Sequence, residues 1–476
     1  MIGNIIGRKR EQDMLQRIYE SEQSEFVAVC GRRRVGKTFL VREYFEEQMV
    51  FQLSGLANSS TQEQLRNFYY TLRRFDITVN EAPKDWIDAF EMLINYLSSL
   101  KIQRKVVFLD ELPWMDTYGA NFVTALEHFW NGWASAQHDI VLIVCGSATS
   151  WMMDKLINNH GGLYGRLTHR IFLEPFNLCE TEQFLQKRGF LLSRYEIVET
   201  YMILGGIPYY LSLMDARLSL AQNIDRLLFN PNGELYNEFN MLYRSLFSDS
   251  EAYIKVVESL NKKGYGMTRN EIAENTQIKT GKSLTTILDN LEACGSIRKY
   301  VNFGCSTKKA LYQLVDFFTL FYFRFLIKSS FRDLQYWSKI QHTSQFYAWA
   351  GISFEVLAIQ HIQQIKHHLG IAGVATNTFS WRSKKSEDER GAQIDLVIER
   401  ADNTINLCEM KFSESDFEIT KDYDAVLRNK IGRFRDETKT KKSVQLTFIT
   451  TYGIHKNTYS SIAQNEVTME DLFENE

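Results

Sequence analysis

The feature that most constrains the fold is an eight-residue segment at positions 31–38, GRRRVGKT. It fits the pattern G-x-x-x-x-G-K-[ST] and lies between FVAVC, which reads as a buried strand, and FLVREYF, which has helical periodicity. The glycines of such a loop let consecutive backbone N–H groups turn toward phosphate oxygens, and the start of the following helix adds positive charge. The sequence therefore predicts a nucleotide site formed by Gly31, Arg32, Arg33, Arg34, Val35, Gly36, Lys37, Thr38 and Phe39.

Two acidic residues end a second predicted strand, KVVFLDE at 105–111. We expect Asp110 to lie beside Thr38, where the two would hold Mg²⁺, and Glu111 to polarise the attacking water. Lys37 is expected to reach the β and γ phosphates. An Asp-Glu pair alone is also typical of a helix N-terminus, but its position downstream of an intact P-loop favours the nucleotide site.

A third predicted strand, IVLIVC at 140–145, is followed by GSAT. Its carboxyl end is expected to face the same crevice as the P-loop, because the strands of such a sheet run parallel. Ser147 is then the expected catalytic sensor, hydrogen-bonded to the γ phosphate or to the attacking water. The alternative is a turn of small residues that leads into the next helix.

Five ordered segments carry a resemblance to a known family: IIGRKREQDMLQRI, DELPW, CGSATS, LYGRLTHRIFLEPF and GGIPYYL. Together they resemble the archaeal-type ATPases of the STAND/AAA+ group over about residues 1–240. The resemblance implies that the nucleotide is ATP or its product ADP, and that Gly7 and Arg8 lie against the adenine. It also implies that Pro208 packs on the base from a helical lid.

Arg166 belongs to the YGR part of the fourth segment. The resemblance implies that its guanidinium approaches the γ phosphate. An arginine that reaches a neighbour's site would make a homo-oligomer part of catalysis. From the residues alone, Arg166 and Arg170 are equally consistent with surface salt bridges.

Residues 249–315 are expected to form a winged helix-turn-helix. Two helical patterns, EAYIKVVESLNK and GKSLTTILDNLEACGSI, flank a Thr268–Glu271 capping box, and RKYVNFG with KKALYQL reads as a two-stranded wing. Residues 251–345 hold 14 basic and 8 acidic side chains, which fits either a contact with DNA or a solvated surface. In the ATPases that this chain resembles, such a domain often serves as a packing module instead. The DNA interpretation uses Lys279, Lys282, Ser283, Thr285, Arg298, Lys299, Lys308 and Lys309.

The C-terminal part contains two strand-like runs, GAQIDLVIE and TINLCEMKF, joined by RADN as in a hairpin. If the turn centres on Asp402, Asp395 faces Glu409. Alternation along the strands then puts these two carboxylates and Lys411 together on one face. The same register pairs Leu396 with Cys408 and Ile394 with Met410 on an apolar face that Ile398 and Phe412 complete.

Directly opposed carboxylates, with Cβ atoms about 4.5–5.5 Å apart, repel one another. A divalent cation between Asp395 and Glu409 would stabilise them most simply, and hard oxygen ligands suit Mg²⁺. Lys411 would then orient the attacking water or neutralise charge that develops on a phosphate. The alternative is an exposed Asp–Lys–Glu face of a two-sided sheet.

These residues resemble the PD-(D/E)xK nuclease core, with Asp395 in IDLVIE and Glu409 and Lys411 in the E-x-K element. Ile394 stands in place of the motif proline. Glu355, in GISFEVLAIQHI, matches the helix-borne metal ligand of that family. With the ATPase and winged-helix segments, the resemblance extends over nearly the whole chain to archaeal-type ATPases that carry a DUF234-like C-terminal domain.

The expected fold is α/β, a P-loop NTPase of the AAA+ kind followed by a winged helix and a restriction-endonuclease-like domain. The expected function is an ATPase coupled to DNA binding or to metal-dependent DNA cleavage. The alternative is a STAND-type regulatory switch that captures a protein partner, with a C-terminal domain that binds without cleaving. The expected boundaries are 1–175 for the ATPase core, 176–248 for the lid, 249–315 for the winged helix, 316–345 for connecting helices and 346–476 for the nuclease-like domain.

Cysteines and apolar runs indicate a cytoplasmic protein without a membrane partner. Six widely spaced cysteines form no CxxC pair, which favours buried thiols in a reducing compartment. The N-terminus lacks an apolar signal core, and the run FFTLFYFRFLI is too short to span a bilayer. The histidines His361, His367 and His368 lack an i,i+4 ligand spacing and are expected on a solvated helix face.

Overall fold

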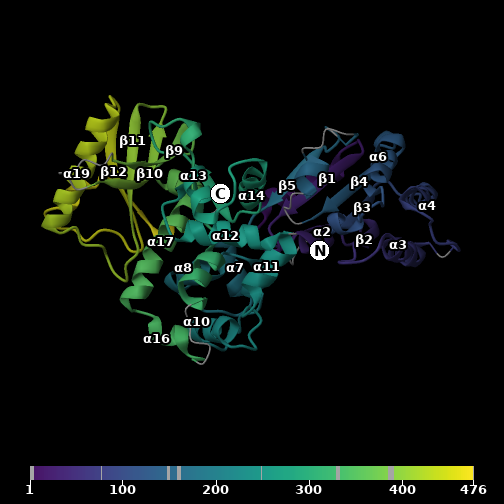
Figure 1. Cartoon of the computed structure of the whole chain (residues 1–476), viewed down its shortest axis with the longest axis horizontal. Helices are drawn as coiled ribbons and strands as arrows, with labels where there is room; N and C mark the ends of the chain where they lie inside the picture. Colours follow the sequence, from purple (N-terminus) through teal and green to yellow (C-terminus); the bar gives the residue numbers. More distant parts are fainter. Residues whose placement is uncertain are drawn as a thin grey trace. The chain divides into compact units, whose positions relative to one another are not determined.

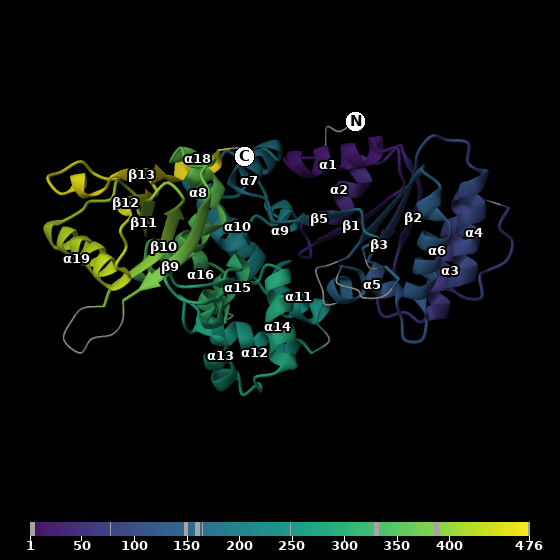
Figure 2. The same ribbon diagram turned by 90° about the horizontal axis from the view of Figure 1, so that it is seen from above.

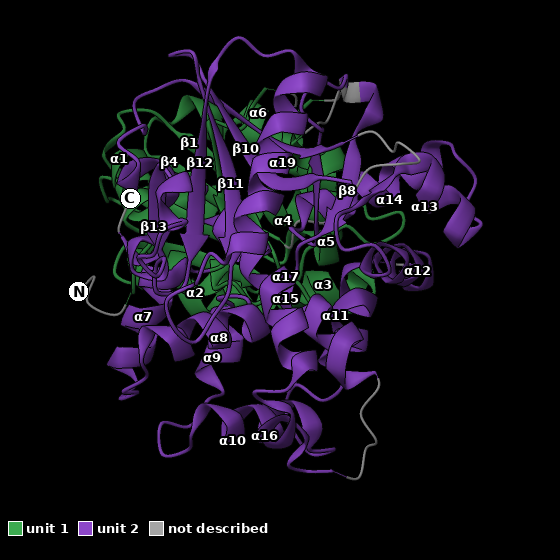
Figure 3. Cartoon of the chain, turned by 90° about the vertical axis from the view of Figure 1, so that its left-hand side faces the viewer, with its two compact units in different colours: residues 1–175 green, residues 176–476 purple. Residues whose placement is uncertain are grey.

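The chain divides into two compact units in the computed structural model: unit 1, Met1–Pro175, and unit 2, Phe176–Glu476 (Figure 3). Figure 1 shows the helices and strands of both units coloured along the sequence. The structure describes residues 5–474 except for 77, 147–150, 158–161, 164, 248, 328–332 and 384–390.

Unit 1 is built on a five-stranded parallel sheet with the strand order β2-β3-β4-β1-β5. The three central strands are buried along their whole length, as is usual for a parallel sheet. β4 lies between β1 and β3, so its carboxyl end faces the space between the P-loop and the two strand-end acids. The strands are β1 (Glu25–Gly31), β2 (Met49–Ser54), β3 (Lys105–Asp110), β4 (Ile140–Cys145) and β5 (His169–Leu173).

Helices α3, α4 and α6 pack together against this sheet, and their apolar residues form one core with strand residues such as Phe26 and Leu142. The packing is rich in aromatic contacts: Phe90 of α4 stacks on Phe129 of α6, with ring centroids 5.1 Å apart. Figure 2 shows the three helices side by side. The helices of unit 1 are α1 (Lys9–Glu20), α2 (Lys37–Tyr44), α3 (Thr61–Phe75), α4 (Trp86–Ser99), α5 (Leu112–Met115), α6 (Phe122–Gly132), η1 (Ala134–Ala136) and η2 (Met152–Ile157).

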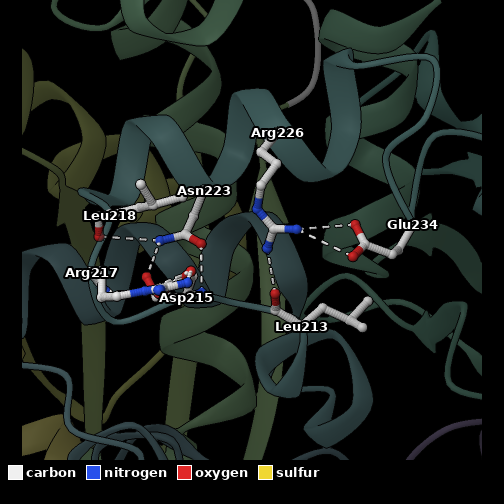
Figure 4. A network of polar contacts seen from close by, with 7 residues as sticks. All are labelled: Leu213, Asp215, Arg217, Leu218, Asn223, Arg226 and Glu234. Atoms are coloured by element: carbon white, nitrogen blue, oxygen red, sulfur yellow. Dashed lines mark hydrogen bonds and ion pairs between the residues drawn. The ribbon is translucent and has the colours of Figure 1, made fainter.

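Unit 2 begins with a group of helices, of which α7, α8 and α10 each start with a capping box. A polar network fixes the segment after α9 (Figure 4). Arg226 donates to the carbonyl of Leu213 at 2.5 Å and lies 3.2 Å from the Glu234 carboxylate, while Asn223 donates to the carbonyl of Asp215 at 3.0 Å. The helices are α7 (Leu178–Lys187), α8 (Arg194–Leu204), α9 (Pro208–Ser212), α10 (Leu220–Ile224), η3 (Asp225–Phe229) and α11 (Glu238–Leu246).

Residues 250–314 form three α-helices, a short 3₁₀ helix and a small antiparallel sheet with the strand order β6-β8-β7. The predicted Thr268–Glu271 capping box is confirmed, because the Thr268 N–H donates to Glu271 Oε2 at 2.7 Å and the Glu271 N–H donates to Thr268 Oγ1 at 3.3 Å. The elements are α12 (Ser250–Asn261), β6 (Met267–Thr268), α13 (Arg269–Thr276), α14 (Lys282–Ala293), β7 (Ile297–Tyr300), η4 (Thr307–Lys309) and β8 (Leu311–Leu314).

The loop between β7 and β8 is anchored in the C-terminal part of unit 2. The Phe303 N–H donates to the carbonyl of Ser380 at 2.8 Å. The Phe303 ring packs against Phe379 and Phe434, with ring centroids 5.4 and 5.2 Å away. This loop is therefore part of the core that surrounds the C-terminal sheet.

A second five-stranded sheet ends unit 2, with the strand order β13-β12-β11-β10-β9. β9, β10 and β11 run antiparallel, and β11, β12 and β13 run parallel, because α19 crosses over between β11 and β12. The remaining elements of unit 2 are α15 (Phe317–Phe321), η5 (Tyr322–Leu326), α16 (Tyr336–Ile340), α17 (Ser344–Gln360), α18 (Ile362–His368), β9 (Thr376–Arg382), β10 (Gln393–Arg400), β11 (Thr404–Lys411), α19 (Lys421–Thr438), β12 (Ser443–Thr450), η6 (Ser460–Ile462), β13 (Asn465–Thr468) and η7 (Met469–Phe473).

The predicted hairpin register is correct along the β10–β11 ladder, where Leu396 faces Cys408. The predicted side of the sheet is wrong for Ile394. The pairing of β10 with β9 shifts between Ile394 and Val397, and such a bulge reverses the alternation of side chains. Ile394 consequently shares a core with Val397 and Leu407 rather than with Leu396. Apolar residues of both alternating sets are buried, so this sheet has no solvated face over these positions.

No helix in the described part of the chain is both long and apolar enough to cross a membrane. All six cysteines are free; five are buried and Cys305 is exposed. The expected solvated position of His361 is wrong, since its side chain is only 1% exposed. His361 Nε2 accepts from the Leu178 N–H at 3.1 Å, and Nδ1 lies 2.9 Å from the carbonyl of Leu357.

Candidate functional site

The P-loop joins β1 to α2, and the side chain of its lysine forms hydrogen bonds to the loop backbone. Lys37 Nζ donates to the carbonyls of Gly31 at 3.0 Å and Arg32 at 2.9 Å. Gly31 has φ 150°, and a Cβ atom there would lie 2.3 Å from the carbonyl oxygen of Leu173 on β5. Gly36, just before α2, has the left-handed φ of 93°. Glycine is thus required at 31 by the neighbouring strand and at 36 by the turn into the helix.

The predicted pairing of Thr38 with the acid at the end of β3 is present. Thr38 Oγ1 lies 3.1 and 2.9 Å from the two carboxylate oxygens of Asp110. Asp110 is 4% exposed and its Oδ1 also accepts from the Glu111 N–H at 3.0 Å. A hydroxyl and a carboxylate held together at the first turn of α2 are hard oxygen donors of the kind that Mg²⁺ prefers. These residues therefore fit the metal that a P-loop nucleotide brings with it.

Glu111 sits on a left-handed backbone, with φ 49° and ψ 49°, which costs a non-glycine residue about 1–2 kcal/mol. The turn is fixed by Gly55: its N–H donates to the carbonyl of Asp110 at 2.9 Å, and a Cβ on it would lie 2.7 Å from the carbonyl of Glu111. Burial raises the pKa of the Glu111 carboxyl, against the opposing charge of Lys37. A carboxylate with a raised pKa is better suited to accept a proton from water.

Gly7 and Arg8, the expected adenine contacts, lie beside the P-loop. Both have left-handed backbones, with φ 60° and 56°, and Arg8 Nη2 donates to the carbonyl of Val35 at 3.4 Å. Gln12 donates to the carbonyl of Gly7 at 2.7 Å and fixes this turn. Of the other predicted loop residues, Arg34 has a left-handed φ of 72° and Phe39 is 51% exposed.

Three more residues are predicted to contact the nucleotide: Ser147, Arg166 and Pro208. Ser147, the expected sensor, lies outside the described residues. Arg166 is exposed on unit 1, and Arg170 donates to the carbonyl of Ile157 at 3.3 Å. Pro208 is the first residue of α9 in unit 2, and its contact with an adenine stays a prediction.

Residues 6–214 match a family model described as an ATPase domain predominantly from Archaea. The chain carries an archaeal-type ATPase domain. The uncharacterized protein MJECL04 of Methanocaldococcus jannaschii is 26% identical to this chain over 329 residues, which cover 67% of this chain and 68% of that protein.

Two solved structures are similar to this chain at low sequence identity. The Walker-type ATPase PABY2304 of Pyrococcus abyssi aligns with a TM-score of 0.47 at 18% identity, over 67% of this chain and 95% of that one. The ORC2 protein of Aeropyrum pernix, in ADPNP-ADP complexes, aligns with a TM-score of 0.42 at 13% identity, over 76% of this chain and 97% of that one.

Beyond the ATPase domain, unit 2 contains the predicted carboxylates. Glu409, at the end of β11, is 3% exposed and already paired: Lys411 Nζ lies 3.0 Å from Oε1 and Lys430 Nζ lies 2.7 Å from Oε2. The Tyr423 hydroxyl also donates to Oε1. Burial opposes ionisation, but the two ammonium groups and the hydroxyl keep the pKa of Glu409 below its ordinary value.

Sequence reasoning missed Tyr423 and Lys430, which both lie on α19. A signal was present, because Tyr423, Leu427, Lys430 and Phe434 recur at helical spacing, and Leu427 and Phe434 are core residues. Two polar residues on the buried stripe of a helix need buried partners. Glu409 is that partner for both.

Glu355 and Asp395 lie in the same electrostatic environment as Glu409. The pKa of Glu355 on α17 is raised to about 8 by burial, then by Asp395 and Glu409, while Lys411 opposes the rise. Gln393 Nε2 donates to Asp395 Oδ1 at 2.6 Å. The β10–β11 ladder ends at Leu396–Cys408, so the predicted direct pairing of Asp395 with Glu409 lies beyond it.

The three predicted metal ligands do not close around one point. In the described part of the chain, the ligand atoms of Glu355, Asp395 and Glu409 are not all within 4.8 Å of one another. The ammonium groups of Lys411 and Lys430 neutralise the Glu409 carboxylate instead. Glu409 can bind a metal only if Lys411 or Lys430 breaks its ion pair with the carboxylate.

The basic residues expected on a DNA-binding wing are partly engaged within unit 2. Arg298 Nε donates to Gln313 Oε1 at 2.7 Å, and its guanidinium carbon lies 4.7 Å from the centroid of the Tyr300 ring. Burial lowers the pKa of Arg298. Lys299 and Lys282 are exposed, the latter at the start of α14.

Proposed function

We propose that the N-terminal unit hydrolyses ATP with Mg²⁺ at a site made by Lys37, Thr38, Asp110 and Glu111. The observation that carries the proposal is the contact of Thr38 Oγ1 with both carboxylate oxygens of Asp110, at 3.1 and 2.9 Å. Lys37 would exchange its two loop carbonyls for phosphate oxygens, and Thr38 and Asp110 would hold the metal. Glu111 would take the proton of the attacking water.

The test is ATP binding and turnover by the full chain. Lys37→Ala should remove binding in isothermal titration calorimetry and remove phosphate release. Lys101→Ala, at an exposed lysine of the same unit, is the matched control and should behave as wild type. Wild-type protein that neither binds nor hydrolyses ATP, or an unchanged Lys37→Ala protein, would refute the proposal.

Arg166 is the proposed arginine of the γ phosphate, and its exposed position suits a contact in trans as well as in cis. Mixing two inactive variants separates these cases. If Arg166 acts in trans, Arg166→Ala mixed with Lys37→Ala should regain activity, because one subunit keeps an intact P-loop and its neighbour keeps the arginine. Full activity of Arg166→Ala alone would remove the residue from the site.

For unit 2 we propose a DUF234-like, nuclease-like domain that takes Mg²⁺ or Mn²⁺ and acts on DNA. The gathering of Glu355, Asp395, Glu409 and Lys411 supports it, since burial and then the two other carboxylates raise the pKa of Glu355, while the lysine opposes the rise. Acids that crowd one another in this way are relieved by a divalent cation. Incubation of DNA with Mn²⁺ should give cleavage that Asp395→Ala abolishes.

The rival proposal is a STAND-type switch in which this domain binds without cleaving. The ion pairs of Lys411 and Lys430 with Glu409 favour it, because they neutralise the carboxylate without a metal. Absence of cleavage together with salt-insensitive capture of a protein would support the switch. Strong salt-dependent DNA binding would support the DNA proposal.

We propose that residues 249–315 are a winged helix that serves first as a packing module. The anchoring of Phe303 in the C-terminal core supports this role. DNA would then meet the exposed start of α14, at Lys282 and Ser283, rather than the loop that carries Phe303. The other proposed parts are the ATPase core 1–175, the lid 176–248, the connecting helices 316–345 and the nuclease-like domain 346–476.

A further inference from the structure

One histidine and two carboxylates lie close together near the C-terminal end of the described residues. His368 is the last residue of α18, Asp471 lies in η7, and Glu474 follows η7. One ligand atom from each of these three side chains lies within 4.8 Å of the other two, the one such group among the described residues. Outside this group, His367 pairs with Glu474: its Nδ1 lies 2.8 Å from Glu474 Oε2.

Contacts outside the cluster fix the orientation of His368. Its Nε2 lies 3.1 Å from the backbone carbonyl of Glu466. A carbonyl only accepts, so this nitrogen carries the hydrogen, and the lone pair of the neutral ring is on Nδ1. Nδ1 faces Asp471 Oδ1 at 2.9 Å, where a cation between the two atoms would satisfy both.

Hydrogen bonds from outside the cluster also fix the orientation of the Asp471 carboxylate. Its Oδ2 accepts from the Thr468 N–H at 2.7 Å and from the Thr468 hydroxyl at 2.9 Å, which leaves Oδ1 for the cluster. A ligand whose far atom is fixed by a hydrogen bond while its near atom points inward is the usual arrangement around a bound metal. His368 and Asp471 both have it.

We propose that His368, Asp471 and Glu474 bind a divalent transition metal such as Zn²⁺. Zn²⁺ takes mixed imidazole and carboxylate ligands, whereas Mg²⁺ prefers oxygen ligands alone, so the donor set selects the former. The side chains of His368 and Asp471 are 35% and 18% exposed, which leaves a path for the ion.

The metal would fasten a segment that joins several parts of unit 2. η7 packs against α7, α8, α18 and β13. Arg194 of α8 pairs with Glu470, and its guanidinium carbon lies 4.6 Å from the centroid of the Phe473 ring. Zn²⁺ on His368 and Asp471 would therefore tie α18 to the same turn that α7 and α8 contact.

The experiment uses the full chain, stripped with EDTA and titrated with Zn²⁺ in a calorimeter. Wild type should bind one more equivalent than His368→Ala, or bind at least about 10-fold more tightly. His455→Ala, at an exposed histidine of the same unit, is the matched control and should bind as wild type. Mg²⁺ should not compete.

Glu474→Gln serves as a second variant, because it lies beyond the last helix and changes little of the packing. It should also lower the affinity for Zn²⁺ while leaving the circular-dichroism spectrum unchanged. Zn²⁺ should raise the melting temperature of wild type and not that of either ligand variant. Identical Zn²⁺ isotherms for wild type, His368→Ala and Glu474→Gln would overturn the proposal and leave an ion-pair cluster only.

Discussion

The two candidate sites differ in what their acids contact. In the ATPase domain, the Asp110 carboxylate contacts the hydroxyl of Thr38, and Lys37 donates hydrogen bonds to two backbone carbonyls. In unit 2, Glu409 is already neutralised by Lys411 and Lys430. In the first site the partners of Lys37 and Asp110 are neutral groups, which do not cancel their charges. The second is electrostatically satisfied, so a metal there has to displace a cation of the protein.

The largest expected effect tests the first half of this comparison. Glu111→Gln keeps the shape of the side chain but removes the proton acceptor, so ATP turnover should fall about 10²–10⁴-fold. ATP affinity should stay within a few-fold of wild type, because Lys37 and Thr38 are untouched. Turnover and affinity are measured by phosphate release and calorimetry, with Glu127→Gln as the control. Loss of affinity would mean that Glu111 has a structural role.

His361 should make unit 2 sensitive to acid. Burial lowers its pKa to about 4 from an ordinary 6.5. The folded state therefore binds fewer protons than the unfolded state between these values, and stability that is full above pH 6.5 is lost as the pH falls toward 4. The loss should be about 3 kcal/mol.

Urea unfolding followed by tryptophan fluorescence measures this loss, because Trp337 and Trp349 are buried in unit 2. His361→Gln keeps an acceptor for the Leu178 N–H and should flatten the pH dependence. If wild type and His361→Gln lose the same stability between pH 6.5 and 4, the acid sensitivity has another source.

Lys430→Met tests whether Glu409 depends on cations of the protein. It removes one of two ammonium partners from a carboxylate that is 3% exposed, so the metal-free protein should lose about 1.5–3 kcal/mol of stability. If a metal can replace the lysine, Mn²⁺ should restore more stability to Lys430→Met than to wild type. Lys421→Met, at an exposed lysine at the start of α19, is the control.

A pH effect of the opposite sign is expected for Glu355. Its pKa of about 8 lies above the ordinary 4.5, so the folded state holds an extra proton between these values and stability falls as the pH rises through this window. Glu355→Gln keeps the neutral form and should raise the melting temperature by about 10 °C at pH 8 and change it little at pH 4. Added Mn²⁺ should stabilise wild type at pH 8 and not the variant.

The sequence predicted the parts of both sites that depend on a short stretch of backbone. The P-loop, the Thr38–Asp110 contact and the Leu396–Cys408 register all follow from local patterns. The sequence-based predictions failed where the position of a side chain depends on a second helix or strand. The bulge against β9 moved Ile394 to the other face, and the partner that buried His361, the Leu178 N–H, lies 183 residues away.

The anchoring of Phe303 has a practical consequence for anyone who divides this chain. A fragment that starts at residue 346 would keep Phe379 and Phe434 but lose the ring that packs on both. It would expose apolar surface and would be prone to aggregate. An expression fragment of the C-terminal sheet should therefore begin before α12, at about residue 249, so that it includes the β7–β8 loop that packs against this core.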